Sequence, residues 1–130
     1  MTYYYARSFD RPFEQVVAAT REALSGEGFG VITEIDVRQT LKAKIGEDFR
    51  PYLILGACNP RLAFEALQLE DKVGIMLPCN VIVQDAGGGR TEVAAVDPVA
   101  SMEAIANDAL KEKASAVGEK LRAAIDRIGD

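Results

Sequence analysis

The segment from Tyr52 to Leu69, YLILGACNPRLAFEALQL, constrains the fold more than any other part of the chain. Its first seven residues form a short, continuous apolar run, which indicates a buried strand. Asn59 is a favoured N-cap residue and Pro60 a favoured first helical residue, so a helix is expected to begin there and to run through Leu69. The strand therefore feeds the helix with almost no loop between them. The residues expected on the inner side of this helix are Leu62, Ala63, Ala66, Leu67 and Leu69.

Hydrophobic periodicity also predicts the elements that precede this junction. In the N-terminal part, the expected helix has apolar residues at helical spacing. In the strand that follows, residues expected on the core face alternate with residues on a partly solvated face. The elements expected before Tyr52 are a strand over residues 2–8, a helix capped by Asp10 with Pro12 in its first turn and ending at Gly26 or Gly28, a strand over residues 30–37, and a short helix or turn closed by Gly46.

After Leu69 the pattern predicts a hairpin and a long helix. The run from Gly74 to Gln84 reads as a strand interrupted at Pro78, because a proline has no N–H to donate to a ladder. A glycine turn at residues 87–89 then leads into the second strand of the hairpin. From Pro98 an apolar stripe predicts one helix of about thirty residues, or some 45 Å. Part of such a helix would extend past the sheet, and a second copy of the chain would cover it.

The order of these elements predicts the fold class. No linker, repeat or low-complexity segment divides the 130 residues, so residues 1–130 are expected to form a single domain. About five strands with two or three packed helices indicate an α+β domain of two layers with a long C-terminal helix.

Composition excludes several classes of function. The net charge is -5, and no run of Lys or Arg forms a stripe, so nucleic-acid binding is not expected. The chain has no apolar signal region and no window suited to membrane spanning, which predicts a cytoplasmic protein with reduced thiols. It also has no His, which removes the usual general base and the commonest metal ligand. Lys42 and Lys44 fit a solvated helix face better than an anion site.

Two Cys-Asn pairs are the candidate functional residues. Cys58 and Asn59 precede Pro60, and Cys79 and Asn80 follow Pro78. A helix start favours a thiolate at Cys58, but apolar surroundings favour the neutral thiol, and cysteine is among the most buried residue types. Asn59 is explained by capping. Asn80 is equally consistent with a polar pocket and with bonding to a bulged backbone.

The two cysteines are more informative as a pair. If the strands that contain Cys58 and Cys79 are neighbours, the thiols approach each other across the sheet. A disulfide needs Cα atoms within about 7 Å, and two thiolates leave zinc short of its usual four ligands. Asp85 or Glu70 would have to complete such a site, so a structural role for the pair is favoured over redox or metal use.

The segments GFGVITEIDV, TLKAKIG, YLILGACNPRLAFEAL and GIMLPCNVIV resemble the bacterial and archaeal family known as domain of unknown function 302. The resemblance covers residues 3 to about 128, and GACNP and LPCN are its most specific parts. It implies a TATA-binding-protein-like α+β fold with a curved, mainly antiparallel sheet, and crystal forms that are often dimeric. It implies no DNA function and no established activity.

Three hypotheses of function follow. The first is a homodimeric, non-enzymatic module that binds a small molecule or a protein partner near the two Cys-Asn segments. The second is a thiol-dependent redox or metal-linked protein that uses Cys58 and Cys79. The third is a purely structural motif. No catalytic residue and no metal site is assigned, the cofactor is unknown, and an enzyme is the less favoured class.

Overall fold

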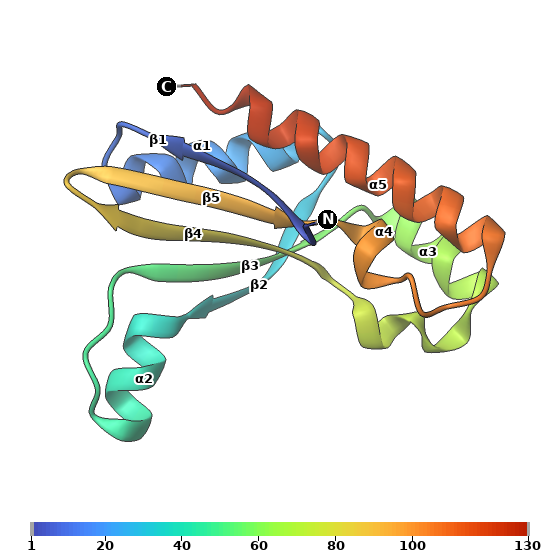
Figure 1. Cartoon of the computed structure of the whole chain (residues 1–130), viewed down its shortest axis with the longest axis horizontal. Coiled ribbons are helices and arrows are strands. Elements are labelled where there is room, and N and C mark those ends of the chain that lie inside the picture. The colour runs from blue at the N-terminus through green and yellow to red at the C-terminus, as the bar shows by residue number, and fades with distance from the viewer. Residues whose placement is uncertain (1, 130) are drawn as a thin grey trace.

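Residues 2–129, the part of the chain that the computed structural model describes, contain one five-stranded antiparallel sheet (Figure 1). Its strand order is β1-β5-β4-β3-β2, so the hairpin of β4 and β5 lies between the outer strands. The predicted α+β fold with an antiparallel sheet is therefore confirmed. The strands are β1 (Tyr4–Phe9), β2 (Gly30–Asp36), β3 (Tyr52–Cys58), β4 (Cys79–Gly87) and β5 (Arg90–Val96).

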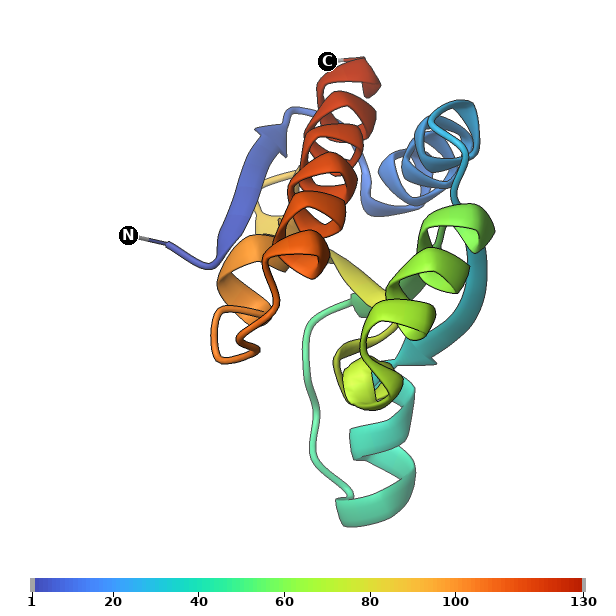
Figure 2. The same ribbon diagram turned by 90° about the vertical axis from the view of Figure 1, so that its right-hand side faces the viewer.

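The two long helices pack on the same face of this sheet. In Figures 1 and 2, α1 and α5 lie side by side above the strands, and α2 stands off on the other side. The short helices α3, η1 and α4 gather beyond one end of the sheet, beneath the first half of α5. The helices are α1 (Phe13–Gly26), α2 (Val37–Ile45), α3 (Pro60–Leu69), the 3-10 helix η1 (Asp71–Met76), α4 (Pro98–Ser101) and α5 (Asp108–Arg127).

Alternation along the strands builds the main core between the sheet and the two long helices. Val81 and Val83 on β4 are fully buried, and so is Leu55 on the neighbouring strand β3. They pack with α1 and α5 residues such as Leu24 and Leu121. A second buried cluster joins the short helices to the first half of α5: Ala66, Val73, Met102, Leu110 and Ala114.

The junction from β3 to α3 forms as the sequence predicts. The strand ends at Cys58, and the Asn59 side chain accepts a hydrogen bond from the backbone N–H of Leu62 at 3.2 Å. Pro60 follows as the first helical residue, where its missing N–H costs nothing. The inner side of α3 is narrower than expected, because Leu67 is 45% and Leu69 38% exposed.

The structure also tests two predicted helix ends, the C-terminus of α2 and the N-terminus of α1. Gly46 closes α2 in the left-handed conformation at φ 70°, as predicted. By contrast, Asp10 does not cap α1, because the N-cap position belongs to Pro12 and no side chain caps this helix. The Asp10 carboxylate lies instead 3.9 Å from the Arg90 guanidinium.

The predicted strand from Gly74 to Gln84 is wrong in its first part. Residues 71–76 form η1, and β4 begins only at Cys79, after Pro78 and a cis Leu77–Pro78 peptide bond. Burial explains the difference, because Val73 is fully enclosed in the cluster under α3 and α5. Tertiary packing has overridden the strand pattern of this short apolar run.

The predicted thirty-residue helix is likewise two helices, α4 and α5. Asn107 separates them: its side chain accepts from the backbone N–H of Leu110 at 3.0 Å and donates to the carbonyl of Leu69 at 3.1 Å. The twenty residues of α5 span about 30 Å. The part of α5 beyond the sheet is covered by α3, η1 and α4 of the same chain, so the expected uncovered extension does not exist.

Gly56 gives a direct test of the packing between β2, β3 and β4. A Cβ there would collide with Thr33 Oγ1 and lie 2.7 Å from Pro78 Cγ, whereas a Cβ at Gly30 has nothing within 4 Å. We expect Gly56→Ala to lower the free energy of unfolding by about 1–3 kcal/mol. Gly30→Ala should be neutral or slightly stabilising. Urea denaturation measures both, and equal effects of the two substitutions would contradict this description of the packing.

Candidate functional site

The two Cys-Asn segments meet at one end of the sheet. Strands β3 and β4 are antiparallel neighbours, with Gly56 opposite Asn80 and Ala57 opposite Cys79. Cys58 follows Ala57 and lies opposite Gly30 on the edge strand β2. The strands that contain the two cysteines are therefore neighbours, but Cys58 and Cys79 do not lie directly opposite each other in the register.

A cavity of about 340 Å³ opens where this end of the sheet meets α3, α4 and α5. Four of the candidate residues line it: Cys58, Asn59, Pro78 and Cys79. Most of the other lining side chains are apolar, so the cavity is an apolar pocket. They include Phe29 and Ile32 near β2, Leu62, Ala63, Ala66 and Leu67 on α3, Leu77 after η1, Met102 after α4, and Leu110, Ala114 and Val117 on α5.

The other two candidate residues do not line the pocket. Pro60 is exposed at the first position of α3, where it has a structural role. Asn80 is exposed and alternates with the inward-facing Cys79 and Val81, so its side chain lies on the opposite face of the sheet. Asn59 lines the pocket, but its carbonyl oxygen is occupied by the cap of α3.

The two cysteines form part of the pocket wall. Both are free thiols; Cys79 is buried and Cys58 partly buried. Burial raises the pKa of the Cys79 thiol from its ordinary 9.0 to about 11, and electrostatic repulsion from the Cys58 sulfur adds to the effect. Cys79 is therefore protonated at neutral pH, which makes it a poor nucleophile and a poor metal ligand.

Other ligands for a metal are not gathered around these thiols. Within residues 2–129, no group of three or more Cys, Asp or Glu side chains is placed to hold a metal ion. Asp85 lies near the other end of β4, beside the turn into β5, and Glu70 is the C-cap residue of α3.

One cation stands at the mouth of the pocket. Of the described side chains that line the cavity, only Lys113 on α5 is charged, and its Nζ lies 2.9 Å from Glu65 Oε1 on α3. Both side chains are more than a third exposed, so solvent reaches the pair. Two of the lining apolar side chains, Ile32 and Leu67, are also well exposed, so the lining reaches the protein surface.

Sequence reasoning missed the wall of the pocket that α4 and α5 supply. Met102, Leu110, Ala114 and Val117 show the helical spacing of a core-facing stripe, and the residues alone do not reveal that a break after α4 turns this stripe toward α3. Lys113 interrupts the apolar stripe of α5 and is the one sequence signal of a polar group at this site.

Comparison with known proteins identifies the family. The family described as domain of unknown function DUF302 matches residues 5–128, so the chain belongs to that family. The chain is similar to the crystal structure of an uncharacterized conserved protein, DUF302, from Bacillus stearothermophilus. The TM-score is 0.91 and the sequence identity 29%, with 99% of this chain and 100% of the other covered. No curated protein matches the chain.

The structure also bears on membrane insertion. Among the helices of residues 2–129, none combines the length and the apolar character needed to cross a membrane.

The raised pKa of Cys79 predicts a pH dependence of stability. The unfolded chain releases the thiol proton near pH 9, whereas the folded protein holds it to about pH 11. The stabilisation that the Cys79 thiol contributes to the folded state is fully present below pH 9. It is lost as the pH rises through the pKa of the folded protein. From pH 8 to pH 11.5, the free energy of unfolding of the wild type should fall about 2–3 kcal/mol further than that of Cys79→Ala. Denaturant unfolding across this range measures the difference, and parallel curves would refute the assignment.

Proposed function

We propose that this protein is a non-enzymatic binding module that holds a small molecule with a largely apolar body in the pocket between β3, β4, α3 and α5. The main support for this proposal is the pocket itself, because residues of the two sequence segments GACNP and LPCN line it together with residues from α4 and α5. A motif that served only to shape the sheet would leave this space filled by its own side chains.

The size and chemistry of the cavity define the class of ligand. A volume of about 340 Å³ lies at the lower end of the range for small-molecule sites. Each buried methylene contributes about 0.8 kcal/mol, so a chain of about eight carbons contributes on the order of 6 kcal/mol before the cost of association. A medium-length alkyl chain or a compact ring system fits this description.

Lys113 adds a preference for one kind of head group. An apolar body in the pocket would leave its polar end at the mouth, beside the Lys113 ammonium group. A carboxylate there would share or replace Glu65 as the partner of this lysine. The proposed ligand is therefore an amphiphile with an anionic group, such as a medium-chain fatty acid.

The state of the cysteines favours binding over thiol chemistry. Cys79 is buried and protonated, and it offers its sulfur as an apolar contact. Cys58 is more accessible, but the charged side chain among the described residues that line the pocket is Lys113, an ammonium group paired with Glu65 and therefore no base for the thiol. A redox or metal-linked role remains the alternative hypothesis, and it requires both thiols to react.

Filling the pocket tests whether it is the binding site. Ala63 lines the cavity from α3, and Ala18 is exposed on α1, away from it. We expect Ala63→Phe to weaken decanoate binding about tenfold or more, because the phenyl ring occupies the space of the alkyl chain. Ala18→Phe, the matched control, should bind like the wild type. Calorimetric titration with decanoate measures the affinities, and equal binding by both variants, or none by the wild type, would overturn the proposal.

The charge preference has its own test. We expect Lys113→Met to weaken binding of decanoate several-fold while leaving binding of decanol unchanged, because only the carboxylate meets the ammonium group. Lys120→Met, on the exposed side of α5, is the control. Competition with a fluorescent apolar probe gives both affinities. If the wild type bound both ligands and Lys113→Met did not distinguish them, the pocket would remain the site and the anionic head group would be wrong.

A further inference from the structure

Helix α2 has little burial within its own chain. It has nine residues, none of them buried, and it projects from the sheet on the side opposite α1 and α5 (Figures 1 and 2). Helices shorter than about twelve residues are marginal in water without packing. Val37, Leu41 and Ile45 recur every four residues and so share one face, yet Ile45 is 65% exposed. Val37 and Leu41 are partly buried, so the exposed end of this apolar stripe is open to a surface of another molecule.

The sheet face on the same side as α2 is also uncovered by the long helices. Register places one apolar residue of every strand in a single row across this face: Ile35, Ile54, Ile82, Ala94 and Ala6. These residues alternate with the buried positions that face α1 and α5, and Ile35 is 48% exposed. The solvated face of an antiparallel sheet normally carries polar side chains. A continuous apolar row on such a face indicates an interface.

The row is complementary to a second copy of itself. It runs from isoleucines on β2, β3 and β4 to alanines on β5 and β1, with Ile82 on the central strand. A two-fold axis parallel to β4 between two facing sheets would set the alanines of one copy against Ile35 and Ile54 of the other. Large side chains would then oppose small ones on the outer four strands, and Ile82 would meet Ile82 of the partner at the axis.

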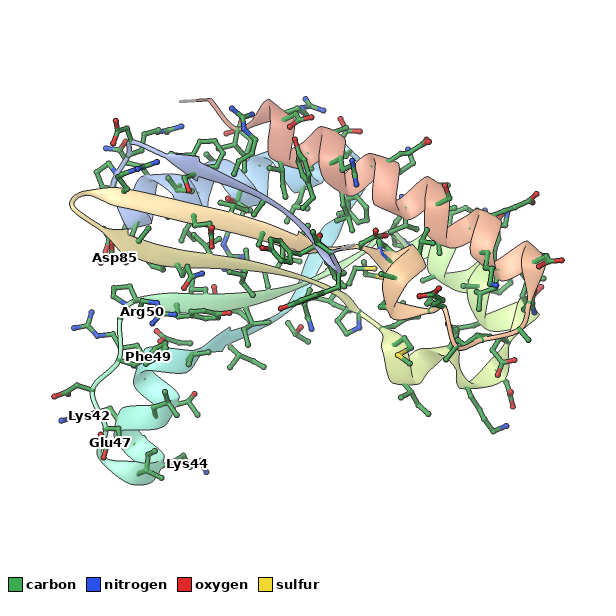
Figure 3. The ribbon with its side chains drawn as sticks, in the orientation of Figure 1. Lys42, Lys44, Glu47, Phe49, Arg50 and Asp85 are labelled. Carbon is green, nitrogen blue, oxygen red and sulfur yellow. The ribbon has the colours of Figure 1, made fainter. Side chains whose placement is uncertain are left out.

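Charge favours the same arrangement. Helix α2 carries Arg38, Lys42 and Lys44 and no acid, although the whole chain has a net charge of -5. Figure 3 shows Lys42 and Lys44 at the outer end of α2, at the same end of the molecule as Asp85 near the β4–β5 turn. Lys42 pairs with the exposed Asp48 at 3.1 Å, a contact that solvent makes easy to exchange.

The two-fold arrangement brings these cations to acidic groups of the other copy. Because the axis exchanges the β2 edge for the β1 edge, α2 of one copy would lie beside the end of β1 in the partner. Asp10 follows that end, and its side chain is 89% exposed and only loosely paired with Arg90 at 3.9 Å. Glu92 lies on the open face next to it, opposite Ser8. Glu92 accepts a hydrogen bond from Gln84 and is partly exposed, so one of its oxygens remains available.

The area of the open face alone, about 1,000 Å² over two copies, reaches the lower bound for a specific interface. Five strands spaced about 4.8 Å apart and about 20 Å long present roughly 500 Å² per copy, and contacts of α2 add to this. Standard interfaces bury about 800 Å² per partner. We propose that this protein forms a two-fold homodimer through the open face of its sheet, and that α2 of each copy packs against the β1 end of the other. This interface lies apart from the ligand pocket and does not depend on its function.

A charge exchange between two variants tests the interface. Variant one carries Lys42→Glu and Lys44→Glu, and variant two carries Asp10→Lys and Glu92→Lys. In sedimentation velocity the wild type should be a dimer of the 14.0 kDa chain. Each variant alone should dimerise on the order of tenfold more weakly, because like charges meet at both contacts. An equal mixture should recover wild-type dimerisation, because each contact again joins opposite charges. Lys111→Glu with Lys120→Glu on α5 is the control and should behave as wild type.

A second pair of variants tests the apolar row. Ile35→Lys places a charge in the row, and Ile75→Lys places the same charge on η1, where Ile75 is 80% exposed. Only Ile35→Lys should yield monomers, and circular dichroism should show both variants folded. A monomeric wild type, a mixture of charge variants that stays monomeric, or dimerisation that Ile35→Lys leaves unchanged would each overturn the proposal.

Discussion

The pairing of β3 with β4 is the constraint on which the rest of this structure depends. Gly56 lies opposite Asn80, and a side chain at Gly56 would meet Thr33 and Pro78. This register directs Leu55, Val81 and Val83 toward the helices, and a slip of one residue would turn every one of them to the other face. The same register brings Ala57 beside Cys79 and so fixes the floor of the pocket.

Two surfaces follow from this single register, and they lie apart. The pocket forms on the helix side, where β4 begins, and the apolar row crosses the open face of the same strands. Helix α2 lies toward the other end of the sheet, after β2. Ligand binding and self-association are therefore proposed to use different surfaces of one sheet. A dimer through the open face would leave the mouth of the pocket, with Lys113 and Glu65, accessible to solvent.

The success of the sequence prediction varies with how local each signal is. The junction from Tyr52 to Leu69 was predicted residue by residue, because an apolar run, an Asn cap and a Pro at the first helical position act over neighbouring residues. The interruption between α4 and α5 was missed, because Leu110 continues the helical spacing of apolar residues. The interruption depends on a hydrogen bond from Asn107 to Leu69, which is far from it in sequence. The chain order also gave no sign that α5 would supply the far wall of the pocket.

The two Cys-Asn segments are proposed to form part of an apolar binding pocket. Amide chemical shifts in a nitrogen-15 NMR titration with decanoate test this claim most directly, because they report on every part of the chain at once. The account predicts shifts that concentrate at Leu62, Ala63, Cys79 and Lys113 and that leave Ile82 and Ala94 on the open face unchanged. Shifts confined to the open face, or no shifts at saturating ligand, would contradict it.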